Sequence, residues 1–572
     1  MKKIYTLCAL AFAALTAFAS PARPGQWKTV RLADGTEVRV ELKGDEWGSY
    51  WQAADGKTYV EDGETGIFKP VDVARMLKAT EPMRLQRAQD RAARLKKLYN
   101  QNQLQASTSH KKAIAVGKKK GLIILVNYPD GKSTQFQPEH TRELLQEVAN
   151  GKNYTNKEFG FTGSVADYFR SQSLGKLDIE FDVVGPYMLG HKRWYYGTNS
   201  GVLRDTKAGE MIAEAVLAAD ADVNYADYDW DGDGEVDQVF VLYAGLGEHD
   251  GGAATTVWPH ESKLSASDYR KAINLDGVKI DTYACSSELQ RGSTICGIGT
   301  ICHEFSHCLG FPDAYDPTKT RFGMGTWDLM DVGSFIDNGF TPSCYTGLER
   351  MIAGWQNAKV LANDTIVNNM GPISEGGEFF IVYNEGYKNE FYILENHQNV
   401  GWDAKRKGTG LLVNYVDYDE RVWTGMAPNA NGDYARYTII CADGYNYDDY
   451  PDDNCFPYGS VNSLTDKSDP AATLNHANVN GKKLMGKPIT DIHRNADGTM
   501  GFTFKREVEL SNTPNPWDNL KTDDVDGITE VNAASQTKAD NRIYTIDGRF
   551  LGTDMKALKS GMYIVNGKKI LK

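Results

Sequence analysis

Two histidines and a glutamate in one short stretch could bind and use a metal ion. His303 and His307 lie four residues apart in the segment from Ile298 to Asp313, IGTICHEFSHCLGFPD. Residues four apart share one face of a helix, so both imidazoles can bind the same ion. Glu304 follows the first ligand, where it can take a proton from a water molecule held by the metal. The pattern predicts a catalytic zinc site.

Asp313 is the expected third protein ligand. It follows His307 by six residues, and Gly310 with Pro312 ends the helix between them. The chain can therefore reverse and return the carboxylate to the ion. Two alternatives stay open: a solvent-facing aspartate in this turn, and Glu349 as a more distant third ligand.

The surroundings of the motif favour a hydrolytic site. Apolar residues flank the histidine pair, which is typical of a buried helix rather than a charged surface helix. A structural zinc site would not need Glu304 beside its ligands. Further on, residues 325–334 (GTWDLMDVGS) resemble a metzincin Met-turn, in which Met330 would form an apolar floor under the metal.

Taken together, the chain resembles the immune inhibitor A family of secreted bacterial metalloproteases. Besides the zinc motif, the likeness rests on residues 163–169, 173–176, 229–237, 258–260, 312–316, 354–355 and 395–398. It implies a metzincin-like catalytic domain and peptide substrates that lie extended along an edge strand. One departure is Val332, where several metzincins have a tyrosine that stabilises the oxyanion.

Composition indicates a soluble, exported protein of several domains. The chain has 572 residues, which at about 100–200 residues per domain predicts three or four domains. Its 63 basic and 76 acidic residues give a net charge of −13, which argues against nucleic acid or an anionic membrane as partner. We expect a monomer.

Residues 1–19 are typical of a signal peptide. Lys2 and Lys3 precede an apolar run, and residues 17–19 (AFA) form a small-x-small cleavage signal. The run is too short and alanine-rich for a membrane anchor, so we expect export without a transmembrane segment. Cys8 would be removed with it.

Residues 20–115 are predicted to be a pro-region. Alternating apolar residues surround an Asp34-Gly35 turn, which indicates a hairpin, and a second strand–turn unit follows around Gly56. A basic helix is expected over 83–104 and an exposed processing linker after it. A permanent N-terminal domain is the alternative. This region contains no cysteine that could bind the zinc ion. Inhibition would therefore need a segment that covers the cleft or one that presents a carboxylate.

The catalytic domain is predicted over 116–361. Buried strands are expected at 122–126, 177–184 and from Val239, with helices at 164–172 and 208–219. Such alternation ahead of the zinc helix predicts a mixed sheet packed on helices, within an α+β protein.

An acidic loop in this domain could hold a structural calcium ion. Carboxylates occupy alternate positions in it: Asp229, Asp231, Asp233, Glu235 and Asp237. They could converge on one hard cation, although Phe240 stands where an EF-hand has its bidentate glutamate. The alternative is a solvated acidic turn. His249 and His260 are expected to be structural or to support the ligands.

Seven cysteines would remain after export. They are Cys285, Cys296, Cys302, Cys308, Cys344, Cys441 and Cys455. Export permits disulfides, and Cys441 with Cys455 could close a loop. Cys302 and Cys308 are expected in the core, too far apart along the helix to bridge each other.

The C-terminal part changes character. Short strands separated by turns predict a β-sandwich-like module over 362–506, followed by a linker at 507–540. Residues 541–572 resemble the C-terminal sorting domain of type IX secretion, which implies contact with that secretion machinery and release or tethering at the cell surface.

These observations predict a secreted zinc endopeptidase with Glu304 as general base and His303, His307 and Asp313 as zinc ligands. The alternatives are a surface adhesion or binding protein with a vestigial zinc site, and a zinc hydrolase using Glu349.

Overall fold

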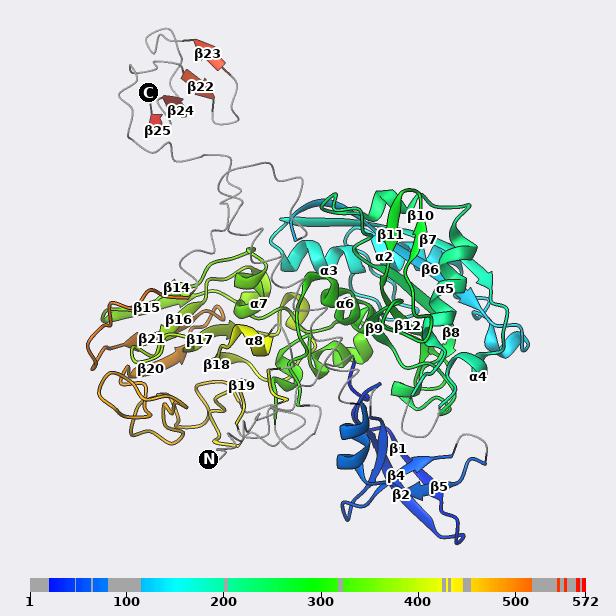
Figure 1. Cartoon of the computed structure of the whole chain (residues 1–572). Coiled ribbons are helices and arrows are strands. Elements are labelled where there is room, and N and C mark those ends of the chain that lie inside the picture. The colour runs from blue at the N-terminus through cyan, green and yellow to red at the C-terminus, as the bar shows by residue number, and fades with distance from the viewer. Residues whose placement is uncertain are drawn as a thin grey trace, which may run out of the picture. The chain divides into compact units, whose positions relative to one another are not determined.

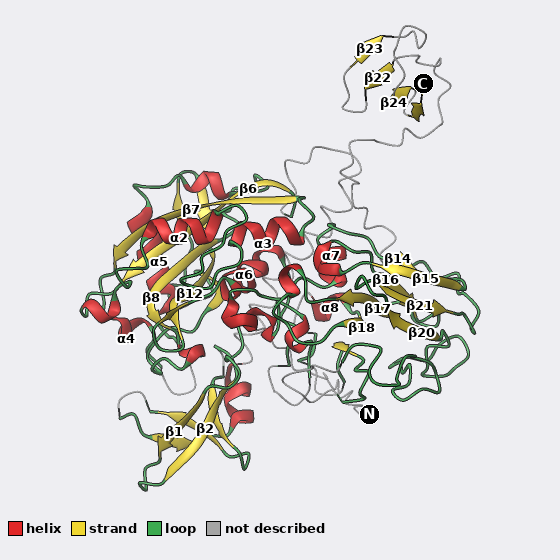
Figure 2. Cartoon of the chain, turned by 180° about the vertical axis from the view of Figure 1, so that it is seen from behind, coloured by secondary structure: helices red, strands yellow, loops and turns green. Residues whose placement is uncertain are grey.

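The computed structural model shows an α+β protein with several sheets and few helices (Figures 1 and 2). The structure describes residues 20–46, 48–62, 65–80, 115–199, 204–316, 322–423, 428–430, 434–445 and 454–516, and the backbone of four strands between 543 and 571. The expected signal peptide, the basic helix over 83–104 and most of the 507–540 linker lie outside these residues.

The N-terminal region, here residues 20–80, is an antiparallel sheet in the order β1-β2-β3-β4-β5. Val30 pairs with Val38 across the Asp34-Gly35 turn, where Gly35 has φ +84°, so the predicted hairpin is confirmed. Residues 73–80 are helical. The strands are Trp27–Arg31, Glu37–Lys43, Tyr50–Ala53, Thr58–Glu61 and Phe68–Pro70.

The central sheet has the order β13-β12-β8-β6-β7, with β9 also paired to β12. β6, β7, β8 and β12 run parallel, whereas β9 and β13 are antiparallel to β12. The predicted strands are present and longer than expected. Their bounds are β6 Gly117–Asn127, β7 Leu177–Met188, β8 Val239–Leu246, β9 His260–Lys263, β12 Thr282–Gln290 and β13 Thr294–Ile295. A separate hairpin pairs β10 Ile273–Leu275 with β11 Val278–Ile280.

Both faces of the central sheet are covered by apolar side chains. Along β6, Ile123 and Leu125 join the core on one face, and Leu122 with Ile124 joins the core on the other. The first core includes residues of α2, α3 and α6, and the second includes those of α5. The helices are α2 Arg142–Asn150, α3 Val165–Gln172, α4 Arg193–Tyr196, α5 Ala208–Ala219, α6 Gly299–Ser306, α7 Gly347–Ile352 and α8 Glu420–Trp423.

Two further sheets follow in residues 359–504. One has the order β14-β16-β17-β18-β19 and the other β15-β21-β20, and Phe380 meets Phe502 between them with ring centroids 5.6 Å apart. The β-sandwich-like module predicted over 362–506 stays a prediction; the structure shows these two sheets in contact at this ring pair. The strands are β14 Lys359–Val360, β15 Thr365–Met370, β16 Phe380–Tyr383, β17 Glu390–His397, β18 Gly410–Asp417, β19 Tyr437–Ile439, β20 Ile489–Arg494 and β21 Met500–Phe504.

Residues 523–572 form a separate compact unit. Its sheet has the order β23-β22-β24-β25. The strands are β22 Ile543–Thr545, β23 Phe550–Gly552, β24 Met562–Val565 and β25 Lys568–Leu571. Among all described helices, none has the length and apolar character needed to cross a membrane.

Candidate active site and metal centre

The two histidines of the motif share one face of a short buried helix. His303 lies in α6, and His307 begins the 3-10 turn that continues it, His307–Leu309. Both side chains are fully buried, and their ring centroids are 5.0 Å apart. The four-residue spacing therefore brings the imidazoles together, as expected for a helix.

Backbone carbonyls orient both rings. Nδ1 of His303 donates to the carbonyl of Leu329 at 2.9 Å, and Nδ1 of His307 donates to that of Phe311 at 2.7 Å. A carbonyl only accepts hydrogen bonds, so each neutral ring carries its proton on Nδ1. Nε2 of each ring therefore has a lone pair available for a metal ion.

The turn after the helix adds a carboxylate to these two nitrogens. Gly310 adopts φ +93°, a conformation that favours glycine, and the chain reverses there. Oδ1 of Asp313 lies 3.1 Å from Nε2 of His303 and 3.4 Å from Nε2 of His307. Ligands about 2.0–2.1 Å from zinc at tetrahedral angles are about 3.3–3.4 Å apart, so these three atoms have a spacing that suits zinc.

Burial makes this donor set costly without a cation. His303, His307, Asp313 and Glu304 each have an exposed fraction of 0%. Nε2 of His303 has no hydrogen-bond partner among the described residues. Two carboxylates in an apolar interior are strongly unfavourable without a compensating charge. The residues present therefore fit a divalent metal ion.

The segment around Met330 is attached to both sides of the centre. The carbonyl of Leu329 binds His303, and the carbonyl of Met330 accepts from the backbone N–H of Ala314 at 2.8 Å. Met330 has an exposed fraction of 1%, and its N–H donates to Asp328 at 2.7 Å. The segment predicted to form a Met-turn therefore contacts both α6 and the turn that carries Asp313.

Glu304 is in contact with the N-terminal region. Its Oε1 accepts a hydrogen bond from the backbone N–H of Ser20 at 3.0 Å, while Oε2 has no hydrogen-bond partner among the described residues. The carbonyl of Ser20 accepts from the indole Nε1 of Trp258 at 2.9 Å. The N–H of Arg23 donates to the carbonyl of His249 at 3.1 Å. The first residues of the N-terminal region thus cover the carboxylate of Glu304, and they do so with a backbone N–H.

The family comparison matches the part of the chain that contains this site. Residues 109–357 match the model of the immune inhibitor A peptidase M6 catalytic domain. The chain contains an immune inhibitor A-like M6 peptidase domain. We call residues 109–357 the M6 domain; it includes the histidine pair, Glu304, Asp313 and Met330.

Two curated relatives are similar to part of this chain. The pre-pro-metalloprotease PrtV of Vibrio cholerae serotype O1 is 28% identical over 296 residues, which cover 44% of this chain and 32% of that protein. Immune inhibitor A of Bacillus thuringiensis subsp. alesti is 23% identical over 273 residues, covering 40% of this chain and 39% of that protein. The matches therefore span about a third of PrtV and about two fifths of immune inhibitor A.

Glu349, the alternative third ligand, has a different role in the M6 domain. Its Oε2 accepts from the N–H of Thr346 at 2.8 Å, and the pair forms the capping box of α7. Among described residues, the donor atoms that converge with His303 and His307 come from Asp313.

The acidic loop of the M6 domain is only partly convergent. Oxygens of Asp229, Asp231 and Asp237 lie within 4.8 Å of one another, whereas Asp233 and Glu235 are not in that group. The carboxylate of Asp229 accepts from the backbone N–H groups of residues 232, 233 and 234. Glu235 instead pairs with Lys279 at 2.8 Å.

A buried ionic cluster connects the M6 domain to the following sheets. The carboxylate of Asp403 accepts a hydrogen bond from Nδ1 of His397 at 2.9 Å and forms an ion pair with Arg406 at 2.7 Å. The thiol of Cys344 donates to the same carboxylate at 3.3 Å. Glu395 contacts Nε2 of His397 at 3.0 Å. A guanidinium already neutralises the carboxylate, so we assign this cluster to structure rather than to a second metal. The cluster gives a structural role to Glu395 and His397 of the 395–398 segment, on which the family resemblance partly rests.

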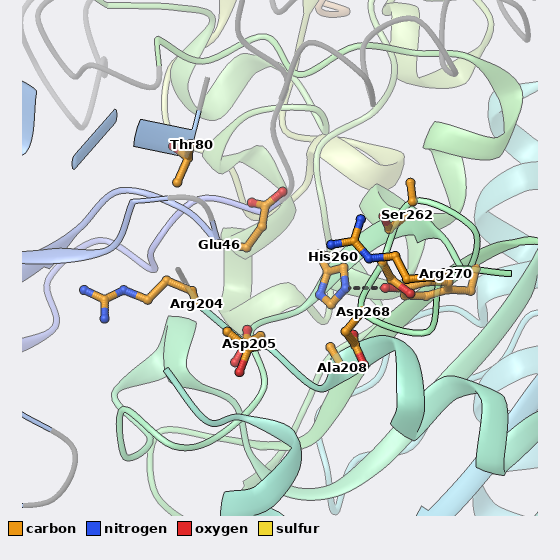
Figure 3. A pocket seen from close by; sticks show the side chains of 13 residues that line it. Glu46, Thr80, Arg204, Asp205, Ala208, His260, Ser262, Asp268 and Arg270 are labelled. Carbon is orange, nitrogen blue, oxygen red and sulfur yellow. Dashed lines mark hydrogen bonds between the residues drawn. The ribbon is translucent and has the colours of Figure 1, made fainter. Parts of the chain in front are cut away.

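His249 and His260 lie outside the metal-facing group. Nδ1 of His260 donates to the carbonyl of Trp258 at 2.7 Å, and its Nε2 accepts from Tyr283 at 3.0 Å. His260 lines a cavity of about 200 Å³ whose other wall includes Glu46 of the N-terminal region (Figure 3). Burial, with the neighbouring charge of Arg23, lowers the pKa of His249 to about 3.

The cysteines of the described part of the chain form no disulfide. All seven after residue 20 are free thiols there, including Cys441 and Cys455, which the sequence suggested could close a loop. Cys302 and Cys308 are buried, as predicted for core residues.

Proposed function

We propose that the chain is the precursor of a secreted zinc endopeptidase. The observation that supports this most directly is the convergence of Nε2 of His303, Nε2 of His307 and Oδ1 of Asp313 beside Glu304. This set lies in an M6 peptidase domain, and the relatives named above are called metalloproteases or immune inhibitors.

The residues of the chain have distinct roles in peptide hydrolysis. A bound zinc ion would polarise the peptide carbonyl and lower the pKa of the attacking water. Glu304 accepts the proton of that water and then delivers it to the leaving nitrogen. The carbonyls of Leu329 and Phe311 keep both imidazoles in the ligand orientation. Burial excludes bulk water and strengthens these interactions.

The N-terminal region acts as an inhibitory pro-region in this proposal. Cleavage of a signal peptide after residue 19 would turn the backbone nitrogen of Ser20 into a free α-amino group. That group would be positively charged beside the carboxylate of Glu304, where the structure has an N–H donor. A base held in this way cannot accept a proton from water.

Other parts of the proposal concern export and stability. Residues 1–19 would direct export, and residues 541–572 would serve type IX secretion; the separate fold of residues 523–572 suits a removable sorting domain. A calcium ion at Asp229, Asp231 and Asp237 would stabilise the loop before β8. The mature enzyme would be a monomer acting on extracellular proteins.

Two measurements test the proposed function. Casein cleavage by the activated protein should be lost in Glu304→Ala, and retention of activity would leave a binding protein as the better interpretation. Zinc content should fall in Asp313→Ala and stay near one ion per chain in Glu349→Ala. The opposite order would assign the third ligand to Glu349.

A further inference from the structure

A pocket beside the active site holds one basic side chain of the N-terminal region. Nε of Arg23 pairs with Oδ2 of Asp250 at 3.1 Å, and a terminal nitrogen donates to Oε1 of Gln290. The guanidinium carbon lies 4.7 Å from the ring centroid of Phe335. The side chains of Arg23 and Asp250 are 3% and 0% exposed. A buried positive charge therefore meets a carboxylate, an amide oxygen and an aromatic face.

The M6 domain itself holds this carboxylate and this amide in place. The backbone N–H of Arg291 donates to Oδ2 of Asp250 at 3.0 Å. Nε2 of Gln290 donates to the carbonyl of Ile295 at 2.9 Å, which turns its Oε1 toward the pocket. The N-terminal region contributes two contacts to Asp250. One is the ion pair with Arg23, and the other is a hydrogen bond from Nε2 of Gln26 at 2.5 Å. The recognition groups thus belong to the domain that remains after that region is removed.

The register of the covering segment relates this pocket to the cleaved bond. Ser20 presents its nitrogen to Glu304, which is the group that protonates the leaving nitrogen in the proposed mechanism. Ser20 therefore stands where the first residue after the cleaved bond would be, and Arg23 is the fourth. Three extended residues span about 10 Å, and the N–H of Arg23 is fixed by the carbonyl of His249 at 3.1 Å.

We propose that the Asp250–Gln290–Phe335 pocket is a substrate subsite that selects arginine at the fourth position after the cleaved bond. This rests on the proposed endopeptidase function, because it takes Ser20 as the product-like residue. The planar guanidinium can pair with Asp250, donate to Gln290 and stack on Phe335 at once. A lysine ammonium meets the carboxylate alone, and an acidic side chain faces a like charge.

Peptide binding to the activated protein tests this subsite. The full-length chain is cleaved in its linker before residue 115, and its affinity is measured for labelled peptides based on residues 20–27, Ser-Pro-Ala-Arg-Pro-Gly-Gln-Trp. The fourth residue is arginine, lysine, alanine or glutamate. We expect the Kd to be about 10- to 100-fold lower for arginine than for alanine, with lysine between them and glutamate weakest.

Variants assign the preference to Asp250. Asp250→Asn should reduce the arginine-to-alanine ratio to within about threefold, whereas Asp497→Asn, an exposed aspartate in a distant turn, should keep it. Cleavage sites in a peptide library, read by mass spectrometry, should be enriched in arginine at the same position. The peptide series on the unmodified sequence keeps the test valid should Asp250→Asn fail to fold.

The outcomes separate the subsite from the enzyme. Two results would overturn the subsite: equal Kd values for all four peptides, or no peptide binding. If casein is still cleaved in either case, the proposed function stands. Selective binding of the arginine peptide without any cleavage overturns the function and supports the pocket. An arginine preference that survives Asp250→Asn overturns the assignment to Asp250.

Discussion

The backbone nitrogen of Ser20 lies 3.0 Å from Oε1 of Glu304, although 284 residues separate them in the chain. The same residue is held by its carbonyl, which accepts from the indole of Trp258 at 2.9 Å. Two hydrogen bonds thus fix one residue against the proposed catalytic base. In the proposed latency mechanism, the chemical state of the nitrogen at position 20 would decide how strongly Glu304 is held.

An extension before Ser20 should weaken latency. A Gly-Ser dipeptide there replaces the charged α-amino group with a neutral amide and adds atoms beside Glu304. We expect the initial rate of cleavage of a quenched peptide by the unprocessed chain to rise about tenfold or more over a chain beginning at Ser20. The extended chain carrying Glu304→Ala is the blank. Equal rates for the two active chains would show that the α-amino group has no inhibitory role.

Trp258→Phe should loosen the N-terminal region. The substitution removes the N–H that binds the carbonyl of Ser20 but keeps an aromatic ring in the core. Loss of one hydrogen bond costs about 0.5–1.5 kcal/mol, so release of the region should be about 2- to 10-fold faster. The rate is followed by gel filtration after cleavage of the linker. Trp194→Phe, at a tryptophan that is 55% exposed, is the matched control and should leave the rate unchanged.

The grouping of the candidate metal ligands was predictable because its geometry is local. Helical periodicity alone places His303 and His307 on one face, and Gly310 provides the turn that returns Asp313. The buried strands of the central sheet were predictable for the same reason, since β6 contains the apolar run 122–126 and β8 is apolar along its length.

Contacts between distant segments could not be predicted in this way. Ser20 and Arg23 stand in a short polar stretch without periodicity, and their partners Glu304 and Asp250 lie more than 200 residues away. The cluster around Asp403 combines the local partners His397 and Arg406 with the distant Cys344, and sequence spacing gives no signal for that distant contact. The suggested Cys441–Cys455 bridge is not formed, and the sequence could not decide this because export permits bridges without specifying which sulfur atoms meet.

The N-terminal region should be released more readily as the pH rises. Ser49 of this region donates to Glu248 at 3.1 Å, and burial raises the pKa of Glu248 from 4.5 to about 7. Burial, with Glu248 nearby, also raises the pKa of Asp205. A carboxyl group whose pKa is higher in the bound state favours binding while it is protonated. For Glu248 this contribution is complete below pH 4.5 and is lost as the pH rises through about 7.

Dissociation of the cleaved N-terminal region measures this linkage. The Kd should increase between pH 5 and 7 by up to about tenfold per pH unit and change little above that range. Glu248→Gln cannot ionise and should flatten the dependence. A steeper dependence in Glu248→Gln, or tighter binding at pH 7.5 than at pH 5.5, would contradict the assignment.

Arg406→Met should destabilise the chain more than loss of a surface ion pair. Arg406 is 2.7 Å from Asp403, with side chains 1% and 0% exposed, and its guanidinium carbon lies 3.8 Å from the Trp327 ring centroid. The charge of Arg406 and the hydrogen bond from His397 lower the pKa of Asp403 despite its burial. The variant therefore leaves a buried carboxylate without its main counter-charge. We expect a loss of about 3–5 kcal/mol in unfolding free energy by urea denaturation.

Arg421→Met is the control for a surface ion pair. The Arg421 side chain is 90% exposed and pairs with Asp419, so its loss should cost less than about 1 kcal/mol of unfolding free energy. Similar losses for the two variants would show that the buried cluster contributes no more than a surface pair.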